Sequence, residues 1–526
     1  MAFRSHVSEQ LSLEDSFNNA SKRVQRVVMN SWAKDFSDVV FPAINGDRFK
    51  VLYTDNEASR PTTPANYIVG ALLIKEMFGL TDDETVEMLI CDLRAQYALH
   101  STSLEEQPIS DRTFSRFRER LYNYEQETGE DILKDEMKSI SETFCRYLNI
   151  NSSLKRMDSL MIAAHCKNMS RLEIIYTCVL NCVKLLKETG NELLIPEEMR
   201  HYLEADDLNQ VIYYAKSEDV EPRLEKVINE ARKMKEIMED DEWHTFSQYQ
   251  LLIRVLNEQA NTDGSIKDKK EIKADSLQNP NDPDATYRYK AGKNHKGYVG
   301  NLVESIGESG ASQITDFSYD PNTHSDQEYS REYIENHSDE TAIADGAYGS
   351  VELQEAAKEK NIKLVTTALT GKEVDPVMAE YEFNEEGTEV IKCPMGNVPI
   401  GNSYYENTGM VRVSFKKSDC QHCPLRQNCK VKFQKKSAVV LVSSKMRARA
   451  QYMKLLGTED YRKLARQRNA IEGIPSVLRR RYHVDEIPVF GQMRSKIFFY
   501  CKVGAFNVVK LITHLPKLTV NEMATA

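Results

Sequence analysis

With 526 residues, 41% of them hydrophobic and 28% charged, and a formal charge of −11, the chain is long enough for roughly two to four globular domains and is not basic overall. The first residues lack the apolar run of a signal peptide, and charged residues interrupt two apolar stretches, 67–80 and 497–512. These features exclude an evident membrane protein, so we interpret both stretches as buried helices and expect a cytoplasmic protein with no membrane partner.

The first 150 residues are predicted to form helices. Apolar spacing at 64–78 predicts a helix that Thr63 caps and Gly79 ends. The next helix, 81–93, begins with Thr and Glu in capping-box spacing, and the helix at 110–121 carries four arginines. This arrangement fits a helix-turn-helix DNA-binding domain and equally a helical bundle that mediates dimerisation.

Alternating strands and helices are predicted in the following part of the chain. The segment 154–164 is short, mostly apolar and contains Asp158, which indicates a strand. The acidic, amphipathic pattern of 171–271 predicts a nearly all-helical region. Residues 298–305 and 312–318 are predicted to form the two strands of a hairpin. Helices are predicted at 326–336 and 351–360, and further strands at 340–345 and 362–368. We therefore predict a mixed α/β sheet of the ribonuclease H kind that a helical insertion interrupts.

Three acidic residues occupy contexts that suit a metal-dependent phosphoryl-transfer site. Asp158 lies inside the first strand, and Asp345 ends a strand before a Gly-Ala-Tyr-Gly-Ser turn, where a carboxylate projects from a sheet edge. Glu472 lies in 461–481, a predicted helix broken near Pro475. Two-metal chemistry needs about three carboxylates around ions roughly 3.5–4 Å apart, and Mg²⁺ prefers oxygen ligands. Three unrelated surface acids would give the same spacing, and this alternative stays open.

Charge is distributed unevenly along the chain. The segment 390–510 carries 24 Lys and Arg against 7 Asp and Glu, a balance of +17, while the remainder is at −28. Such a block predicts a surface for a polyanion, and a solvated basic face is the alternative. Within this block Arg468 precedes Glu472 by four residues, so the two share a helix face and can pair or jointly face DNA.

The ten cysteines fall into two groups. Four of them include a C-x₂-C pair and can close a tetrahedral structural zinc site: Cys393, Cys420, Cys423 and Cys429. A reduced cluster without metal is the alternative, and His422 could replace one ligand. The other six are scattered in predicted helices or their flanks, which indicates buried, reduced thiols: Cys91, Cys145, Cys166, Cys178, Cys182 and Cys501.

The segments MDSLMIAAH, IADGAYGS and RNAIEG, which carry the three acidic residues, resemble the catalytic motifs of DDE transposases of bacterial insertion sequences. The resemblance is to a long branch with a helical insertion and a cysteine cluster. NPNDPDATYRYKAGKNHKGYVGN is similar to the family's stretch before the second strand, and FSRFRERL to part of its N-terminal domain. The matching segments follow the family's order over most of the chain. Three positions depart from the family pattern: Ala465, Pro475 and Arg479.

The resemblance implies a transposase that cuts the ends of its element and transfers the freed strands into target DNA. Asp158, Asp345 and Glu472 would hold two Mg²⁺, replaceable by Mn²⁺, and the four clustered cysteines a structural Zn²⁺. The partners would be terminal inverted repeats, target DNA and further copies in a homodimer or larger homo-oligomer. A catalytically inactive DNA-binding regulator and a nuclease without strand transfer are the alternatives. The resemblance also implies Arg468 and Arg479 as DNA-contacting neighbours of Glu472. From the basic stretch around them we expect Arg466, Arg480 and Arg481 to contact DNA as well.

These observations divide the chain into four segments. Residues 1–150 would be a helical DNA-binding or dimerisation domain. Residues 151–380 would be the first part of a ribonuclease H-like core, with the helical insertion at about 171–280. Residues 381–437 would be a cysteine-rich zinc insert, and residues 438–526 the second part of the core, which carries Glu472.

Overall fold

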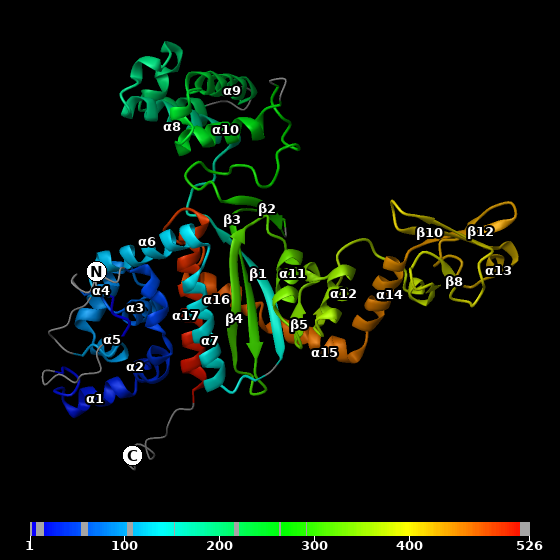
Figure 1. Ribbon diagram of the computed structural model, residues 1–526, viewed down its shortest axis with the longest axis horizontal. Coiled ribbons are helices and arrows are strands. Elements are labelled where there is room, and N and C mark those ends of the chain that lie inside the picture. The colour runs from blue at the N-terminus through cyan, green and yellow to red at the C-terminus, as the bar shows by residue number, and fades with distance from the viewer. Residues whose placement is uncertain are drawn as a thin grey trace.

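A six-stranded mixed sheet lies at the centre of the computed structural model, and helices cover both of its faces (Figure 1). The structure describes residues 3–6, 15–53, 61–102, 109–151, 153–214, 220–261, 265–290 and 292–515. No helix in these ranges is long and apolar enough to span a membrane. The mixed α/β class and the helical N-terminal region agree with the prediction from the sequence.

In the sheet, β1 lies between β3 and β5, and β6 follows β5. β3 is antiparallel to β1 and to β2 and β4, which both pair with it, whereas β1, β5 and β6 are parallel to one another. The predicted strand around Asp158, the predicted hairpin and the strand before Asp345 are confirmed. β2 and the first residues of β3 were not predicted as strand, because their sequence is mostly polar. The strands are β1 (Leu154–Ala163), β2 (Thr286–Lys290), β3 (Lys293–Ile306), β4 (Ser312–Pro321), β5 (Thr341–Ala344) and β6 (Lys363–Thr366).

Helices precede, interrupt and follow the strands. The N-terminal set is α1 (Lys22–Met29), α2 (Trp32–Asp35), α3 (Ala65–Phe78), α4 (Asp82–Cys91), α5 (Leu93–Ala98), α6 (Asp111–Thr128) and α7 (Ile132–Tyr147). The insertion holds α8 (Arg171–Glu188), α9 (Val220–Ile237) and α10 (Ser247–Gln259). The later helices are α11 (Asp326–Asn336), α12 (Val351–Glu359), α13 (Lys417–Gln421), α14 (Ser444–Leu456), α15 (Glu459–Gln467), α16 (Gly473–Tyr482) and α17 (Gln492–His514).

Side chains of β1 alternate between two hydrophobic cores, one on each face of the sheet. Met157 and Met161 pack with α11 and α12. Leu160 and Ile162 belong to the opposite core, which includes α7 and α17. Asp158 has the same parity as Leu160 and Ile162, so its side chain belongs to the α17 face of the sheet.

The two apolar stretches are α3 and α17, and they pack against each other as buried helices, as predicted. The charges that interrupt them pair inside this contact, because Lys502 Nζ lies 2.7 Å from Glu76 Oε2 and both residues are buried. The predicted capping box of Thr81 and Glu84 is confirmed. The structure places the N-cap of α3 at Pro64 rather than at the predicted Thr63, and Pro64 makes no side-chain cap hydrogen bond.

The insertion forms its own core around Cys178, Cys182 and Trp243, apart from the sheet (Figure 1). The prediction of helix as far as residue 271 is wrong, because α10 ends at Gln259 and the described residues that follow are mostly irregular.

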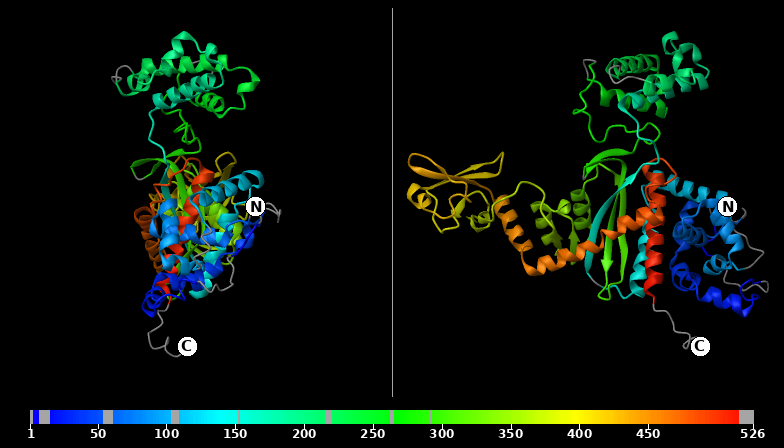
Figure 2. Two further views of the ribbon diagram at one scale, coloured as in Figure 1. Left: turned by 90° about the vertical axis from the view of Figure 1, so that its left-hand side faces the viewer. Right: turned by 180° about the vertical axis from the view of Figure 1, so that it is seen from behind.

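A cysteine-rich lobe projects beyond α14, at the opposite end of the molecule from the N-terminal helices (Figure 2). Its main sheet has the strand order β11–β12–β10–β9, and a separate pair is formed by β7 and β8. Val411, Val413, Phe415 and Val440 fill its small core. The strands are β7 (Glu382–Phe383), β8 (Val390–Lys392), β9 (Gly401–Tyr405), β10 (Met410–Lys416), β11 (Lys432–Phe433) and β12 (Ser437–Val442).

All ten cysteines are free thiols. Cys145, Cys178, Cys182 and Cys501 are buried, as predicted. Cys91 is exposed, which corrects the prediction for this residue, because it ends α4 on the outer side of the helix, next to the exposed Ile90.

Candidate active site

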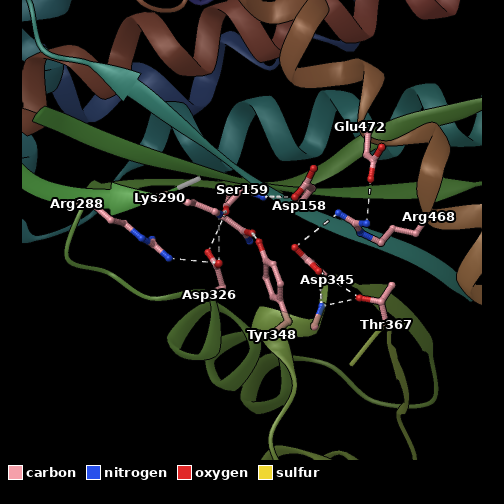
Figure 3. Close-up of polar contacts among 12 residues, drawn as sticks. Asp158, Ser159, Arg288, Lys290, Asp326, Asp345, Tyr348, Thr367, Arg468 and Glu472 are labelled. Atoms are coloured by element: carbon pink, nitrogen blue, oxygen red, sulfur yellow. Dashed lines mark hydrogen bonds and ion pairs between the residues drawn. The ribbon is translucent and has the colours of Figure 1, made fainter. Parts of the chain in front are cut away.

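The two aspartates lie at the same level on neighbouring parallel strands. Ile343 of β5 stands opposite Arg156 of β1, and each aspartate follows this pair by two residues. The register therefore brings Asp158 and Asp345 side by side. β5 ends one residue before Asp345 while β1 continues, so both carboxylates lie where the two strands separate (Figure 3).

Asp345 is fixed by the turn that follows β5. Its Oδ1 accepts hydrogen bonds from the backbone N–H of Gly346 at 2.5 Å and from the Thr367 hydroxyl at 3.2 Å. Its Oδ2 lies 3.8 Å from Nη2 of Arg468. The side chain is 43% exposed, so a ligand can reach the carboxylate from solvent.

Asp158 is less accessible to solvent. Burial raises the pKa of its carboxyl above the usual value, the positive charges of Arg468 and Lys290 oppose this rise, and the negative charge of Asp345 adds to it. Two carboxylates in such proximity repel each other, so the pair favours a cation between or beside them.

Glu472 lies outside a helix rather than within one. The sequence predicted a helix over 461–481 broken near Pro475, but the break comes earlier, between α15 and α16. Pro475 lacks an N–H for the carbonyl of Ile471 and its ring would clash with that carbonyl, so it is tolerated only in the first turn of a new helix. Glu472 consequently becomes the N-cap residue of α16.

Arg468 lies between the second and third carboxylates. Its Nη1 is 2.9 Å from Glu472 Oε1, which is the pairing expected from their spacing, and its Nη2 contacts Asp345. The Glu472 side chain is 54% exposed, whereas that of Arg468 is only 14% exposed. Figure 3 shows the guanidinium pointing toward both acidic side chains.

The three carboxylates fit a magnesium site in their chemistry but are not closed around a common point. Mg²⁺ takes oxygen ligands and keeps several waters, so three carboxylates are a suitable donor set. Among the residues that the structure describes, no group of three His, Cys, Asp or Glu side chains is arranged to hold a metal ion as it stands. Glu472 instead pairs with Arg468, which supplies the positive charge beside the aspartates.

A cationic cluster from β2 flanks Asp158. The buried carboxylate of Asp326 accepts a hydrogen bond from Ser159 Oγ at 2.9 Å and lies 3.3 Å from Arg288 Nη2 and 3.4 Å from Lys290 Nζ. The sequence argument missed Arg288 and Lys290. The available signal was their spacing of two, which places both on one face of a strand.

The five arginines expected to contact DNA differ in their surroundings. Arg468 is engaged with the carboxylates, and Arg479 donates from Nη2 to the carbonyl of Met161 at 2.6 Å. The Arg481 guanidinium lies 5.7 Å from the centre of the Tyr482 ring. Arg466 and Arg480 are exposed and make no side-chain hydrogen bond or ion pair within the described residues.

The four clustered thiols line one small cavity in the lobe. Cys420 and Cys429 are buried, and Cys393 and Cys423 are half-buried. Burial raises the pKa of Cys420 to about 11, and the neighbouring thiols add to this rise. The arrangement brings together the residues expected to bind zinc, although in the described part of the chain they are not in metal-holding geometry.

Two family models match the chain. A model described as Transposase domain (DUF772) matches residues 24–120, and a model described as Transposase DDE domain matches residues 392–512. The second match includes Glu472 and the four clustered cysteines but neither aspartate. Searches of curated proteins and of solved structures gave no match.

Both matching models describe transposase domains, one over the helical N-terminal region and the other over the part of the chain that holds the clustered cysteines and Glu472. Together the two matches indicate a DDE transposase of the insertion-sequence kind.

Proposed function

We propose that the protein cuts DNA at the ends of its element and joins the freed 3′-hydroxyl to target DNA, and that Asp158, Asp345 and Glu472 form its catalytic centre. The observation that carries this proposal is the register of β1 and β5, which sets the two aspartates side by side at an open part of the sheet. Divalent ions held by these carboxylates would supply an activated nucleophile and stabilise charge on the transferring phosphate.

The chain's own residues have distinct parts in this proposal. Asp158 and Asp345 would provide a fixed pair of oxygen donors, because one lies within a strand and the other is held by Gly346 and Thr367. Glu472 would complete the set by turning from Arg468 toward the aspartates. Arg468, once released, would be free to neutralise a phosphate of the bound strand.

The strand order supports a ribonuclease H-like core. Three antiparallel strands, β4, β3 and β1, continue into the parallel strands β5 and β6, with helices on both faces. On this basis we propose the domain division 1–150, 151–380, 381–437 and 438–526, with the insertion at about 171–280. The N-terminal helices share a hydrophobic core with α17, so they would move with the catalytic sheet as one unit.

DNA would bind along the exposed part of the basic block. Three cations of this block pair with largely buried acids and are not available to phosphates, namely Lys496, Lys502 and Lys510, whereas Lys445, Lys454 and Arg494 pair with acids at the surface. The exposed arginines Arg466, Arg480 and Arg481 lie close to Glu472 in the chain and are the best placed for contact with the strand that is cut. Binding would weaken steeply with salt, because each phosphate contact releases counterions.

We also propose that the cysteine cluster holds one structural Zn²⁺, since four thiols from three segments converge on one cavity. Metal analysis of purified protein should then find about one zinc per chain, lost in the double variant Cys420→Ser/Cys423→Ser. Folded wild-type protein without zinc would contradict this assignment.

Cleavage of element-end DNA tests the catalytic proposal. Wild-type protein should nick such DNA with Mg²⁺ or Mn²⁺, while Asp345→Asn should bind the same DNA and leave it intact. Glu352→Gln on α12 is a matched control, because this exposed acid pairs with Lys445 away from the site. Equal cleavage by wild type and Asp345→Asn would remove the assigned role. Binding without cleavage by wild type would favour an inactive DNA-binding regulator, and cleavage without joining would favour a nuclease.

A further inference from the structure

The segment that carries Glu472 is weakly anchored by its own side chains. None of the residues of α15, all of which the structure describes, is buried, and the short 3-10 turn at Arg468–Ala470 contributes none either. Ile471 and Ile474 enter the core and set the depth of the segment. Additional contacts are needed to fix the direction in which Glu472 points.

Arg156 supplies one such contact on the N-terminal side of Glu472. It lies on β1 two residues before Asp158 and is buried. Its Nη2 is 2.7 Å from Glu304 Oε2 on β3, and its Nη1 donates to the carbonyl of Gln467 at 2.8 Å. Gln467 ends α15, where the carbonyls have no partner within the helix, so the guanidinium caps that end.

The Arg156 guanidinium is itself firmly held. Glu304 is 1% exposed, and its other oxygen lies 2.7 Å from Lys510 Nζ on α17 and accepts a hydrogen bond from the Ser312 hydroxyl at 2.6 Å. Both carboxylate oxygens are thus used, so Arg156 cannot turn away without leaving a buried charge poorly paired.

Arg479 supplies the second contact, on the C-terminal side of Glu472. Its Nη2 donates to the carbonyl of Met161 at 2.6 Å, and its Nε lies 3.1 Å from Asp485 Oδ2. Asp485 Oδ1 in turn accepts from the N–H of Ala163 at 3.1 Å. β5 pairs with β1 only as far as Arg156, so this part of β1 has backbone groups free for such contacts.

The two contacts have a common geometry. Arg156 and Met161 lie on either side of Asp158 in β1, and Gln467 and Arg479 lie on either side of Glu472. We propose that Arg156 and Arg479 are positioning residues that together fix the orientation of Glu472 relative to Asp158. This inference rests on the proposed catalytic function of the two acids. It assigns Arg479 to the protein scaffold rather than to DNA.

Conservative variants test the inference. Arg156→Lys retains a charge for Glu304 but cannot also reach the Gln467 carbonyl, and Arg479→Lys cannot serve both Asp485 and the Met161 carbonyl. Asp485→Asn removes the negative charge and one of the two oxygens that accept from Arg479 and Ala163, without changing the arginine. Arg462→Lys is the control, because the guanidinium of Arg462 on α15 is exposed and has no side-chain partner among the described residues.

The first measurement is hydrogen exchange of peptides covering residues 468–474 in metal-free protein without DNA. Exchange should be roughly tenfold faster in the three variants than in wild type and Arg462→Lys, as expected for loss of one net hydrogen bond to a charged group. The second is Mn²⁺ binding to DNA-free protein by electron paramagnetic resonance, where the variants should bind about 10- to 100-fold more weakly.

DNA affinity without divalent metal separates positioning from DNA contact. The variants should bind element-end DNA as wild type does, whereas a phosphate-contacting Arg479 would give weaker binding in Arg479→Lys and a smaller salt dependence. Unchanged hydrogen exchange in folded variants overturns the inference, as does unchanged Mn²⁺ affinity or a loss of DNA affinity.

The experiments distinguish a failure of the positioning role from a failure of the proposed catalytic function. If wild type binds Mn²⁺ through Asp345 but never cuts DNA, catalysis is refuted and the exchange data still decide the positioning role. If Arg156→Lys fails to fold, judged by thermal unfolding, then Arg479→Lys and Asp485→Asn decide it, because their side chains are partly exposed.

Discussion

Arg468 occupies the place of a cation in the candidate site, which leads to an unusual prediction for its removal. Nη1 lies 2.9 Å from Glu472 and Nη2 lies 3.8 Å from Asp345. For Glu472 to become a metal ligand, at least the first of these contacts must break. The ion pair therefore competes with metal binding, and Arg468→Met should bind metal more tightly in the absence of DNA.

The size of this effect follows from the exposure of the partners. Glu472 is 54% and Asp345 43% exposed, so water screens both contacts and each contributes only about 0.2–1 kcal/mol. Loss of the two together corresponds to about 1 kcal/mol, or roughly a fivefold gain in affinity. Stability without metal should change by a similarly small amount, because the buried Nε of Arg468 has no hydrogen-bond partner among the described residues and its removal offsets part of the loss.

Mn²⁺ titration of DNA-free protein, followed by electron paramagnetic resonance, measures the affinity directly. Arg466→Met is the matched control, because Arg466 is exposed on the preceding helix and has no ion-pair partner within the described residues. Cleavage by Arg468→Met at saturating metal should nevertheless fall, since the variant lacks the charge offered to the bound phosphate. Weaker Mn²⁺ binding by Arg468→Met than by Arg466→Met would refute the reasoning and show that Arg468 organises the carboxylates.

Three further predictions concern other parts of the molecule. Pro475→Ala should allow the helix to continue through Glu472, and so lower cleavage without lowering thermal stability. Circular dichroism would measure the helix content and the stability, and the nicking assay the cleavage. Unchanged cleavage would contradict the role given to Pro475. Lys502→Met should destabilise the protein by about 3 kcal/mol in urea unfolding, because it leaves Glu76 buried with only Lys75 beside it, whereas the exposed control Lys445→Met should change stability by less than about 1 kcal/mol. A thiol reagent at pH 8 should modify Cys91 in native protein but not Cys501, because burial raises the pKa of Cys501 to about 12 and blocks access; rapid labelling of Cys501 would argue against the packing of α17.

Much of the sheet could be predicted from the sequence because its strands are apolar and end at sharp turns. The strand through Asp158 and the strand before Asp345 have this pattern, and their parallel pairing follows from the helix-containing connections between them. β2 could not be found in this way. Its residues are mostly polar, and it becomes a strand only because β3 offers it a backbone partner.

The direction in which polar side chains point, and so their partners, could not be predicted from the sequence either. Arg479 lies in a run of three arginines within a basic block, where the simplest expectation is contact with DNA. In the structure its partners are the carbonyl of Met161 and Asp485, because α16 passes beside the open end of β1, and the sequence did not indicate these partners. A count of charged residues gives the net charge of a segment. Ion pairs between distant segments, such as Lys502 with Glu76, decide how much of that charge faces solvent.

The position of Glu472 shows how a local rule and a long-range contact combine. Pro475 forces the helix to end before it, which can be read from the sequence once the clash with the carbonyl of Ile471 is considered. That break leaves Glu472 at a helix N-cap with freedom to turn. Arg468 and the carbonyl contacts on either side then decide where it points, and both depend on strands far away in the chain. In such a site Glu472 can pair with Arg468 in the metal-free state. It can then turn toward the two aspartates when a divalent cation replaces the guanidinium.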